Sequence, residues 1–496
     1  MNKYEKTCGI FLPIFSLPNK YGIGTLGKEA KKFIDFLKEC KQSYWQILPL
    51  GYTSFGDSPY QVLSTFAGGI NYIDLESLVD DNLLSIDDLK DLENSDSKID
   101  YENLYHNRYI VLKKAYENFL KKDQKDFFEF IKNNDYWLKD FSIFMFLKKI
   151  HQDTSFYNWP SKYKMMNQKD KEELYINNQK DIDFYAFIEY LFFKELKELK
   201  DYANLNNIKL IGDMPVYVAL DSCDVWSHPE LFLLGDDYIP EVVAGVPPDY
   251  FTKEGQLWGN PIYDYKYLEK TNYEWFIKRV KHHLDMYDII RLDHFRGYAS
   301  YYEVKFGAKN AIGGTWQKGP QMKLFKALKK SLNIKLEDRI IAEDLGFLTE
   351  DVYQLLKDTN LLGMKVLQFG MPDKNNPHMT VNYKYKQVSY IGTHDNDTTL
   401  GWFKNLTKEK QLEILNYLRC DRKDVVNKMI ELIMKSRSKI VIISLMDYLN
   451  LDSDARINTP GKLQGNWTFR LPSNCINKKL IEYIKNITIN TKRDMN

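Results

Sequence analysis

Carboxylate side chains stand at or just beyond the ends of four apolar segments in this chain. They are Asp213, Asp293, Glu343 and Asp395. Burying a carboxylate among apolar residues costs free energy unless the group has a partner or a chemical role. Because four separate segments share this arrangement, we expect the four carboxylates to meet in one pocket.

Cleavage of a glycosidic bond fits this set, because it needs two carboxylates in different protonation states. Arg291 precedes Asp293 by two residues, which places both side chains on the same face of a strand. The guanidinium favours the ionised form of Asp293, as a nucleophile requires. Glu343 follows an apolar run, and crowding by other carboxylates raises the pKa of such a group, as a general acid requires. We expect Asp395 to hold the hydroxyls of the sugar ring.

Each of these residues also has a purely structural alternative. Asp213 precedes a turn-forming proline and can cap a loop, while Arg291 and Asp293 can form an ion pair inside the fold. Glu343 can face a helix N-terminus, and Asp395, in THDND, can cap a helix or form an Asx turn. A structural role for all of these residues at once is less expected than for any one of them, because several strands end in the same pattern.

Other catalytic chemistries find little support. The chain has no GxSxG, HExxH or GxxxxGK[ST] sequence, which disfavours serine hydrolases, zincins and P-loop enzymes. A metal site made of Asp293, His294 and His394 is a remaining alternative, although His394 can also be a core histidine. The five cysteines are scattered without a CxxC pair, which indicates a reducing compartment. We predict no metal and no cofactor.

The segments that carry these residues predict a (β/α)8 barrel. Eight short, nearly continuous apolar runs have the pattern of parallel strands buried on both faces. They cover residues 8–14, 44–50, 209–218, 288–295, 339–345, 362–369, 388–395 and 439–449. Amphipathic helical patterns lie between them, at residues 28–41, 192–207, 275–287, 322–333 and 350–359. In such a barrel the active site lies at the carboxyl ends of the strands.

Two stretches are too long for simple barrel units. Residues from about 71 to 201 are charged and helical in pattern, which predicts a helical insertion between the second and third strands. Residues from about 219 to 273 are irregular and rich in Pro, Gly, Asp and aromatics, which predicts a loop-rich insertion before the fourth strand. We expect residues 1–496 to form a single catalytic domain.

Composition limits the partners. The net charge is +1, which gives no reason to expect nucleic acid or an anionic membrane surface. No apolar run is long enough to cross a membrane and no signal peptide is apparent, so we expect a cytoplasmic protein. Aromatic residues make up 15% of the chain. Most of these rings pack in cores, but some can be platforms on which sugars stack.

Taken together, these segments resemble the 4-α-glucanotransferases of the amylomaltase type, also called disproportionating enzymes, in the α-amylase-like superfamily. The matching sequences run nearly end to end. They are LPNKYGIGTLG (17–27), WQILPLG (45–51), GDSPYQ (56–61), IGDMPVYVALDSCDVW (211–226), GVPPDYFTKEGQLWGNPIYDY (245–265), IIRLDHFRGY (289–298), IAEDLG (341–346), GMKVLQF (363–369), GTHDNDT (392–398), ARINTPG (455–461) and GNWTFRL (465–471). The 245–265 stretch is the one particular to this family.

The resemblance implies a retaining double displacement that moves a segment of a 1,4-α-glucan to a new 4-position on glucose or another 1,4-α-glucan. It implies that Asp293 forms the covalent glucosyl-enzyme, that Glu343 is the acid/base, and that Asp395 stabilises the transition state. Maltooligosaccharides and 1,4-α-glucans are the implied partners. The implied substrate-binding residues are Tyr60, Asp213, Asp249, Trp258, Arg291, His294, His394 and Asn466.

Some segments depart from the family pattern. Residues 67–70 read AGGI where AGNP is common, Met446 and Asp447 stand where Gln-Asp is common, and residues 371–383 match loosely. These departures affect loop geometry and substrate length, not the three carboxylates. An α-1,4-glucan hydrolase, and a glycan-binding protein without activity, are the alternative functions. The sequence leaves the choice between monomer and homodimer open.

Overall fold

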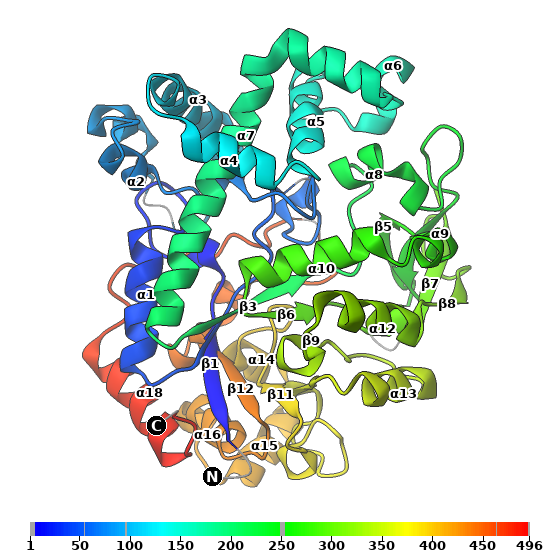
Figure 1. The fold of residues 1–496 in the computed structure, drawn as a ribbon. Helices are drawn as coiled ribbons and strands as arrows, with labels where there is room; N and C mark the ends of the chain where they lie inside the picture. The colour runs from blue at the N-terminus through cyan, green and yellow to red at the C-terminus, as the bar shows by residue number, and fades with distance from the viewer. Residues whose placement is uncertain (1–4, 54, 95–96, 249–252, 463, 495–496) are drawn as a thin grey trace.

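A closed barrel of eight parallel strands forms the centre of the molecule (Figure 1). The computed structural model describes residues 5–53, 55–94, 97–248, 253–462 and 464–494. The barrel strands are β1 (Thr7–Phe11), β2 (Tyr44–Gln46), β3 (Lys209–Met214), β6 (Ile289–Leu292), β9 (Ile340–Ala342), β10 (Gly363–Val366), β11 (Gln387–Tyr390) and β12 (Ile440–Ser444). Each coincides with one of the eight apolar runs, although β1 and β11 begin one residue earlier than expected, so the prediction of a (β/α)8 barrel is confirmed.

The barrel closes between β9 and β10. Hydrogen bonds link the strands in the order β10-β11-β12-β1-β2-β3-β6-β9, and every pair is parallel. Ile341 pairs with Leu362 across the remaining seam, and the Ala342 N–H donates to the Leu362 carbonyl at 2.8 Å. The Asp344 carboxylate then accepts the Met364 N–H. Gly363 allows this contact, because a Cβ there would lie 2.8 Å from an Asp344 oxygen.

Helices cover the outside of the barrel. The expected amphipathic patterns correspond to α1 (Lys28–Glu39), the end of α7 (Gln168–Leu205), α10 (Glu274–Met286), α12 (Gln321–Leu332) and α13 (Glu350–Thr359). The last part of the chain adds α14 (Thr399–Asn405), α15 (Lys408–Leu418), α16 (Val425–Met434), α17 (Leu445–Tyr448) and α18 (Lys478–Asn490). In α10, for example, Phe276, Val280 and Leu284 form the buried face, which follows the i, i+4 spacing of a helix stripe.

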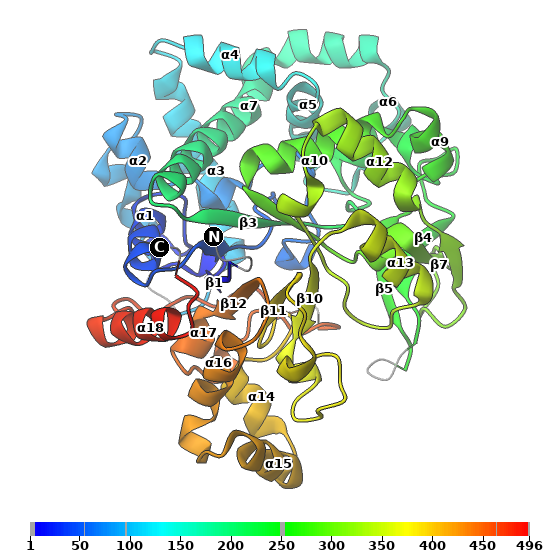
Figure 2. The same ribbon diagram turned by 60° about the horizontal axis from the view of Figure 1, so that its bottom comes forward.

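Between β2 and β3 the chain is mainly helical. Its α-helices are α2 (Leu75–Asp80), α3 (Tyr101–Phe119), α4 (Lys125–Asn133), α5 (Leu138–Ile150), α6 (Ser161–Lys164) and α7. They lie together at one side of the barrel (Figures 1 and 2). The long helix α7 runs through this group and then packs against α1 and β3, so it also serves as the barrel helix that precedes the third strand.

A second, antiparallel sheet takes two of its strands from the stretch expected to be irregular and two from the chain after β6. Its strands are β4 (Val242–Val246), β5 (Gln256–Pro261), β7 (Ser300–Lys305) and β8 (Thr315–Lys318), in the order β5-β4-β7-β8. Short helices α8 (Cys223–Ser227), α9 (Tyr265–Lys270) and α11 (Arg296–Ala299) flank it. Sequence pattern missed these strands because β4 finds its partner β7 beyond the fourth barrel strand, more than 50 residues away.

The opposite end of the barrel is closed by Arg493. Its guanidinium is fully buried and donates to the carbonyls of Thr7, Met434, Ser436 and Ser438 at 2.7–3.0 Å. Thr7 is the first residue of β1, Met434 is the last residue of α16, and Ser436 and Ser438 precede β12, so Arg493 ties these three elements together. Among the residues that the structure describes, no helix is long and apolar enough to cross a membrane.

Candidate active site

The expected carboxylates gather at the carboxyl end of the barrel. Asp213 is the last but one residue of β3, Asp293 directly follows β6, and Glu343 directly follows β9. Asp395 lies five residues beyond the end of β11. Because parallel strands in a barrel all point the same way, these positions share one rim.

Arg291 joins two of the carboxylates. Its Nη1 donates to both oxygens of Asp213, at 2.8 and 2.7 Å, and to Oδ1 of Asp293 at 2.8 Å. Arg291 and Asp213 are buried, whereas the Asp293 side chain is a quarter exposed. Burial raises the pKa of Asp213, and the Arg291 charge opposes that effect. The expected Arg291–Asp293 pair is therefore present, and it leaves the face of Asp293 open to a ligand.

Glu343 is held by one backbone donor from its own loop and one from the segment after β6. Its Oε2 accepts the His294 N–H and its Oε1 accepts the Leu345 N–H, both at 2.8 Å. His294 adopts φ 47°, a left-handed conformation that costs energy for a residue other than glycine. Burial, with the charge of Asp293 adding to it, raises the pKa of Glu343 to about 8. A carboxyl with this pKa is largely protonated at neutral pH, as a general acid requires.

Asp395 is positioned by a segment late in the chain. Asn458 donates its side-chain amide to Oδ1 of Asp395 at 2.6 Å, and Arg456 donates to the Asp395 backbone carbonyl at 2.7 Å. Nε2 of His394 lies 3.4 Å from the same Oδ1. The Asp395 side chain is nearly half exposed, so it faces the open side of the site.

Aromatic rings line the wall beside Asp213. The Tyr60 hydroxyl donates to Oδ2 of Asp213 at 2.8 Å, and the Tyr60 ring stacks on His394 with centroids 5.2 Å apart. Trp467 lies 6.0 Å from both rings. Beneath them, the buried Tyr390 hydroxyl donates to Gln46 across the barrel at 2.9 Å.

The remaining expected residues are arranged differently. Trp258, on β5, meets the His294 ring edge to face at 4.8 Å, and burial lowers the pKa of His294 to about 4. Asn466 accepts the Thr459 N–H at 2.9 Å and donates to the Lys462 carbonyl at 2.8 Å, so its amide holds its own loop. Asp249 lies outside the described residues.

Three residues near the carboxylates were not singled out from the sequence. Asn458 and Arg456 hold Asp395, and Trp467 extends the Tyr60–His394 wall. They lie in the ARINTPG and GNWTFRL segments, so family resemblance marks their region. No local spacing connects them to Asp395, which is more than 60 residues away.

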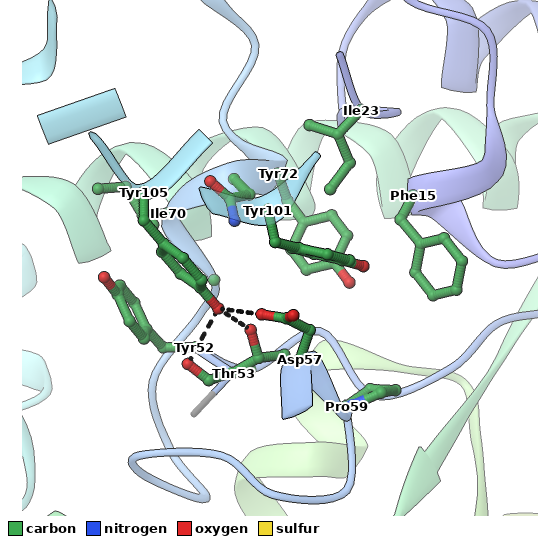
Figure 3. A pocket seen from close by; sticks show the side chains of 13 residues that line it. Phe15, Ile23, Tyr52, Thr53, Asp57, Pro59, Ile70, Tyr72, Tyr101 and Tyr105 are labelled. Atoms are coloured by element: carbon green, nitrogen blue, oxygen red, sulfur yellow. Dashed lines mark hydrogen bonds between the residues drawn. The ribbon is translucent and has the colours of Figure 1, made fainter. Parts of the chain in front are cut away.

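A separate cavity lies at the junction of the barrel and the helices between β2 and β3 (Figure 3). It holds about 340 Å³ of empty space, part of it open to solvent, and tyrosines dominate its lining. The Tyr105 hydroxyl contacts both oxygens of Thr53 and lies 3.1 Å from Oδ1 of Asp57. None of the three expected catalytic carboxylates borders this cavity. Within the described ranges, no group of three His, Cys, Asp or Glu side chains could hold a metal ion.

Comparison with known proteins shows the family of this chain. Residues 12–476 match the family model described as 4-alpha-glucanotransferase. The chain is 45% identical over 481 residues to the 4-alpha-glucanotransferase of Clostridium butyricum, with 96% of this chain and 98% of that protein covered. It is 40% identical over 489 residues to the 4-alpha-glucanotransferase of Aquifex aeolicus (strain VF5), with 97% and 98% covered.

A solved structure extends the likeness to three dimensions. The fold is similar to that of an amylomaltase from Streptococcus agalactiae in complex with acarbose, with a TM-score of 0.96 and 36% sequence identity. The match covers 99% of this chain and 100% of that one. The barrel and the additional elements around it therefore have counterparts in a single solved protein.

Proposed function

The chain belongs to the 4-alpha-glucanotransferase family, and from this membership we propose that Asp293, Glu343 and Asp395 carry out its retaining transfer reaction. The donor is a 1,4-α-glucan or maltooligosaccharide, and the acceptor is the 4-hydroxyl of glucose or of another 1,4-α-glucan. The observation that carries the assignment is the pair of unlike carboxyls, Asp293 bonded to Arg291 and Glu343 with a raised pKa, on neighbouring barrel strands.

In the first half-reaction Asp293 acts as the nucleophile. One of its oxygens forms a bond to the anomeric carbon as the bond from that carbon to the glycosidic oxygen breaks. Protonated Glu343 gives its proton to the departing oxygen, and the shortened glucan leaves as an alcohol. Arg291 supports this step because its Nη1 donates to Oδ1 of Asp293 at 2.8 Å and so orients the carboxylate.

In the second half-reaction Glu343 acts as a base. It removes the proton from the acceptor 4-hydroxyl, whose oxygen bonds to the anomeric carbon while the ester bond to Asp293 breaks. Formation of the ester removes the charge of Asp293, which is one of the two causes of the raised pKa of Glu343. The pKa of Glu343 therefore falls in the intermediate, which suits it to accept a proton.

The surrounding residues bind and orient the donor ring in this proposal. Asp395, held by Asn458, accepts hydrogen bonds from ring hydroxyls and favours the distorted ring of the transition state. Asp213, Tyr60 and His394 form the wall of the donor pocket, and their mutual bonds fix that wall before substrate arrives. Pre-organised groups of this kind spend no free energy on reorientation during reaction.

Incubation with maltotriose tests the proposal. Transfer predicts glucose together with maltooligosaccharides both longer and shorter than the substrate, with no net gain of reducing ends. Conversion to short sugars with new reducing ends would instead indicate an α-1,4-glucan hydrolase. Asp293→Asn is expected to lower kcat by about 10⁴-fold or more while maltotriose still binds, because the nucleophile is lost and the pocket is kept. Turnover near the wild-type rate would remove Asp293 from this role, and binding without turnover in the wild-type protein would indicate a glycan-binding protein.

A further inference from the structure

An exposed aromatic pair lies beside the acid/base loop and is not used by the chemistry described above. Phe347 is 81% exposed and Trp316, on β8, is 41% exposed. We propose that Phe347 and Trp316 form an acceptor subsite, on which sugar rings of a maltooligosaccharide beyond the first acceptor ring stack. This inference rests on the proposed transfer reaction and adds to it a determinant of acceptor length.

One buried guanidinium joins the two aromatic residues. Arg296 lies under the Trp316 ring, with its guanidinium carbon 3.9 Å from the centroid, and its Nη1 donates to the Phe347 carbonyl. Arg296 is 7% exposed, and its Nε has no hydrogen-bond partner among the described residues. Arg296 thus fixes the backbone of Phe347 and one face of Trp316 relative to each other.

The aromatic pair is linked to the proposed catalytic residues by short stretches of chain. Arg296 follows Asp293 by three residues, and Phe347 follows Glu343 by four. Between them, the Leu345 N–H bonds to Glu343 and the Phe295 N–H donates to the Glu343 carbonyl at 3.0 Å. Gly346, at φ 83°, turns the chain directly before Phe347. A four-residue turn, hydrogen-bonded to Glu343, therefore connects Phe347 to the acid/base.

Position relative to the donor pocket indicates the acceptor side. Tyr60, Asp213 and His394 form the wall of the donor pocket. Asp213 is on β3 and His394 follows β11. Phe347 and Trp316 belong instead to the loop after β9 and to strand β8 of the antiparallel sheet. The acid/base protonates the oxygen that links the donor to the departing glucan, so groups beyond Glu343 face the departing glucan and then the acceptor.

The chemistry of the two rings suits a glucan. A pyranose ring has an apolar face of C–H groups, and an exposed aromatic ring can cover that face while the sugar hydroxyls stay hydrated. A single exposed phenylalanine is common on protein surfaces. Here its backbone is fixed by Arg296 next to a second partly exposed ring, and both adjoin a site built for sugars.

The test measures dependence on acceptor length. The donor is a maltosyl fluoride whose non-reducing 4-hydroxyl is blocked, so that it cannot serve as an acceptor. Transfer to glucose, maltose, maltotriose and maltotetraose is followed for the wild type, Phe347→Ala, Phe347→Tyr and Trp316→Ala. We expect the KM for maltotetraose relative to that for glucose to rise about five- to tenfold in the alanine variants, as the loss of one stacking contact predicts.

Matched variants separate binding from folding. Phe347→Tyr keeps an aromatic ring and is expected to retain the wild-type length dependence. Tyr353→Ala removes a 53% exposed ring from α13 outside the pair and is expected to leave the length dependence unaltered. Phe347→Ala changes an exposed loop side chain, so it is informative even if Trp316→Ala does not fold.

Two results would overturn the acceptor subsite. One is an unaltered ratio of KM values in Phe347→Ala, and the other is an equal rise in KM for glucose and for maltotetraose. Failure of the underlying function looks different, because the wild-type protein would then release fluoride without forming any transfer product.

Discussion

At the scale of single residues, Glu343 experiences opposing influences on its pKa. Burial and the charge of Asp293 raise it, while the charge of Arg291 and the backbone N–H groups of His294 and Leu345 lower it. The balance is a pKa of about 8, which depends on burial more than on any one neighbour. The same N–H groups fix the direction of the carboxyl, so orientation is obtained without loss of the proton.

This balance predicts the basic side of the pH profile. The first half-reaction needs protonated Glu343, so kcat/KM for maltotriose is expected to be maintained below about pH 8 and to fall about tenfold per pH unit above it. The measurement is kcat/KM between about pH 6 and pH 10, a range chosen to span that pKa. Glu343→Gln with a maltosyl fluoride donor is the control. Fluoride leaves without proton donation, so the rate at which this variant forms the intermediate is expected not to fall above about pH 8. A wild-type kcat/KM that already falls about tenfold per pH unit between pH 6 and pH 7, as for a glutamate with an ordinary pKa of about 4.3, would contradict the assignment.

At the scale of elements, helix α10 supports the candidate active site through one buried side chain, that of Arg279. Arg279 donates to the carbonyls of Pro215 and Val216, to the Tyr263 hydroxyl and to the Thr65 hydroxyl at 2.6–3.1 Å. Pro215 follows Asp213 by two residues, so Arg279 fixes the loop that leaves β3 at the donor pocket. A packed helix thus determines the position of a loop that makes no regular secondary structure of its own.

Loss of this support is expected to affect stability and activity together. Arg279→Met leaves the buried Pro215 carbonyl without its donor and removes one hydrogen bond each from the Val216 carbonyl and from the Tyr263 and Thr65 hydroxyls, and we expect it to lower the free energy of unfolding by about 3 kcal/mol or more. We also expect a lower kcat on maltotriose, because the loop after Asp213 is released. Lys278→Met is the control on the same helix, since Lys278 is exposed and forms a surface ion pair with Glu274. Its effect on stability is expected to stay within about 0.5 kcal/mol. Equal stability of the two variants, measured by chemical denaturation, would refute the supporting role of Arg279.

At the scale of the whole molecule, the two ends of the barrel have separate tasks. The carboxyl ends of the strands carry the polar site, while the amino ends are closed by Arg493 and its four carbonyl partners. Stability at one end and chemistry at the other are therefore separated by the length of the strands.

This separation predicts a variant that loses stability and keeps catalysis. Arg493→Ala removes the donor from the carbonyls of Thr7, Met434, Ser436 and Ser438, so we expect the free energy of unfolding to fall by about 3 kcal/mol or more. Thermal unfolding and kcat on maltotriose, both measured on the folded protein, check this, with Lys492→Ala as the neighbouring control. A kcat lowered at a temperature at which Arg493→Ala remains folded would show that the two ends are coupled.

The sequence by itself determined the barrel and most of the carboxylate set. Buried parallel strands read as continuous apolar runs, so eight strands were visible without their partners. The polar ends of those strands had to share a rim, which brought Asp213, Asp293 and Glu343 together by topology alone. Arg291 could be paired with Asp293 because two residues on one strand share a face.

Only the tertiary structure decided the contacts between segments that are distant in the chain. Asn458 donates a hydrogen bond to Asp395, and Arg291 donates to Asp213 as well as to Asp293. The antiparallel sheet combines strands that precede β6 with strands that follow it. It also decided the pKa of Glu343, which depends on burial, and the placement of Phe347 beside Trp316 through Arg296. The physical reason is that local pattern reports which face of an element is buried, whereas partners, burial depth and electrostatic environment arise only when elements pack against one another.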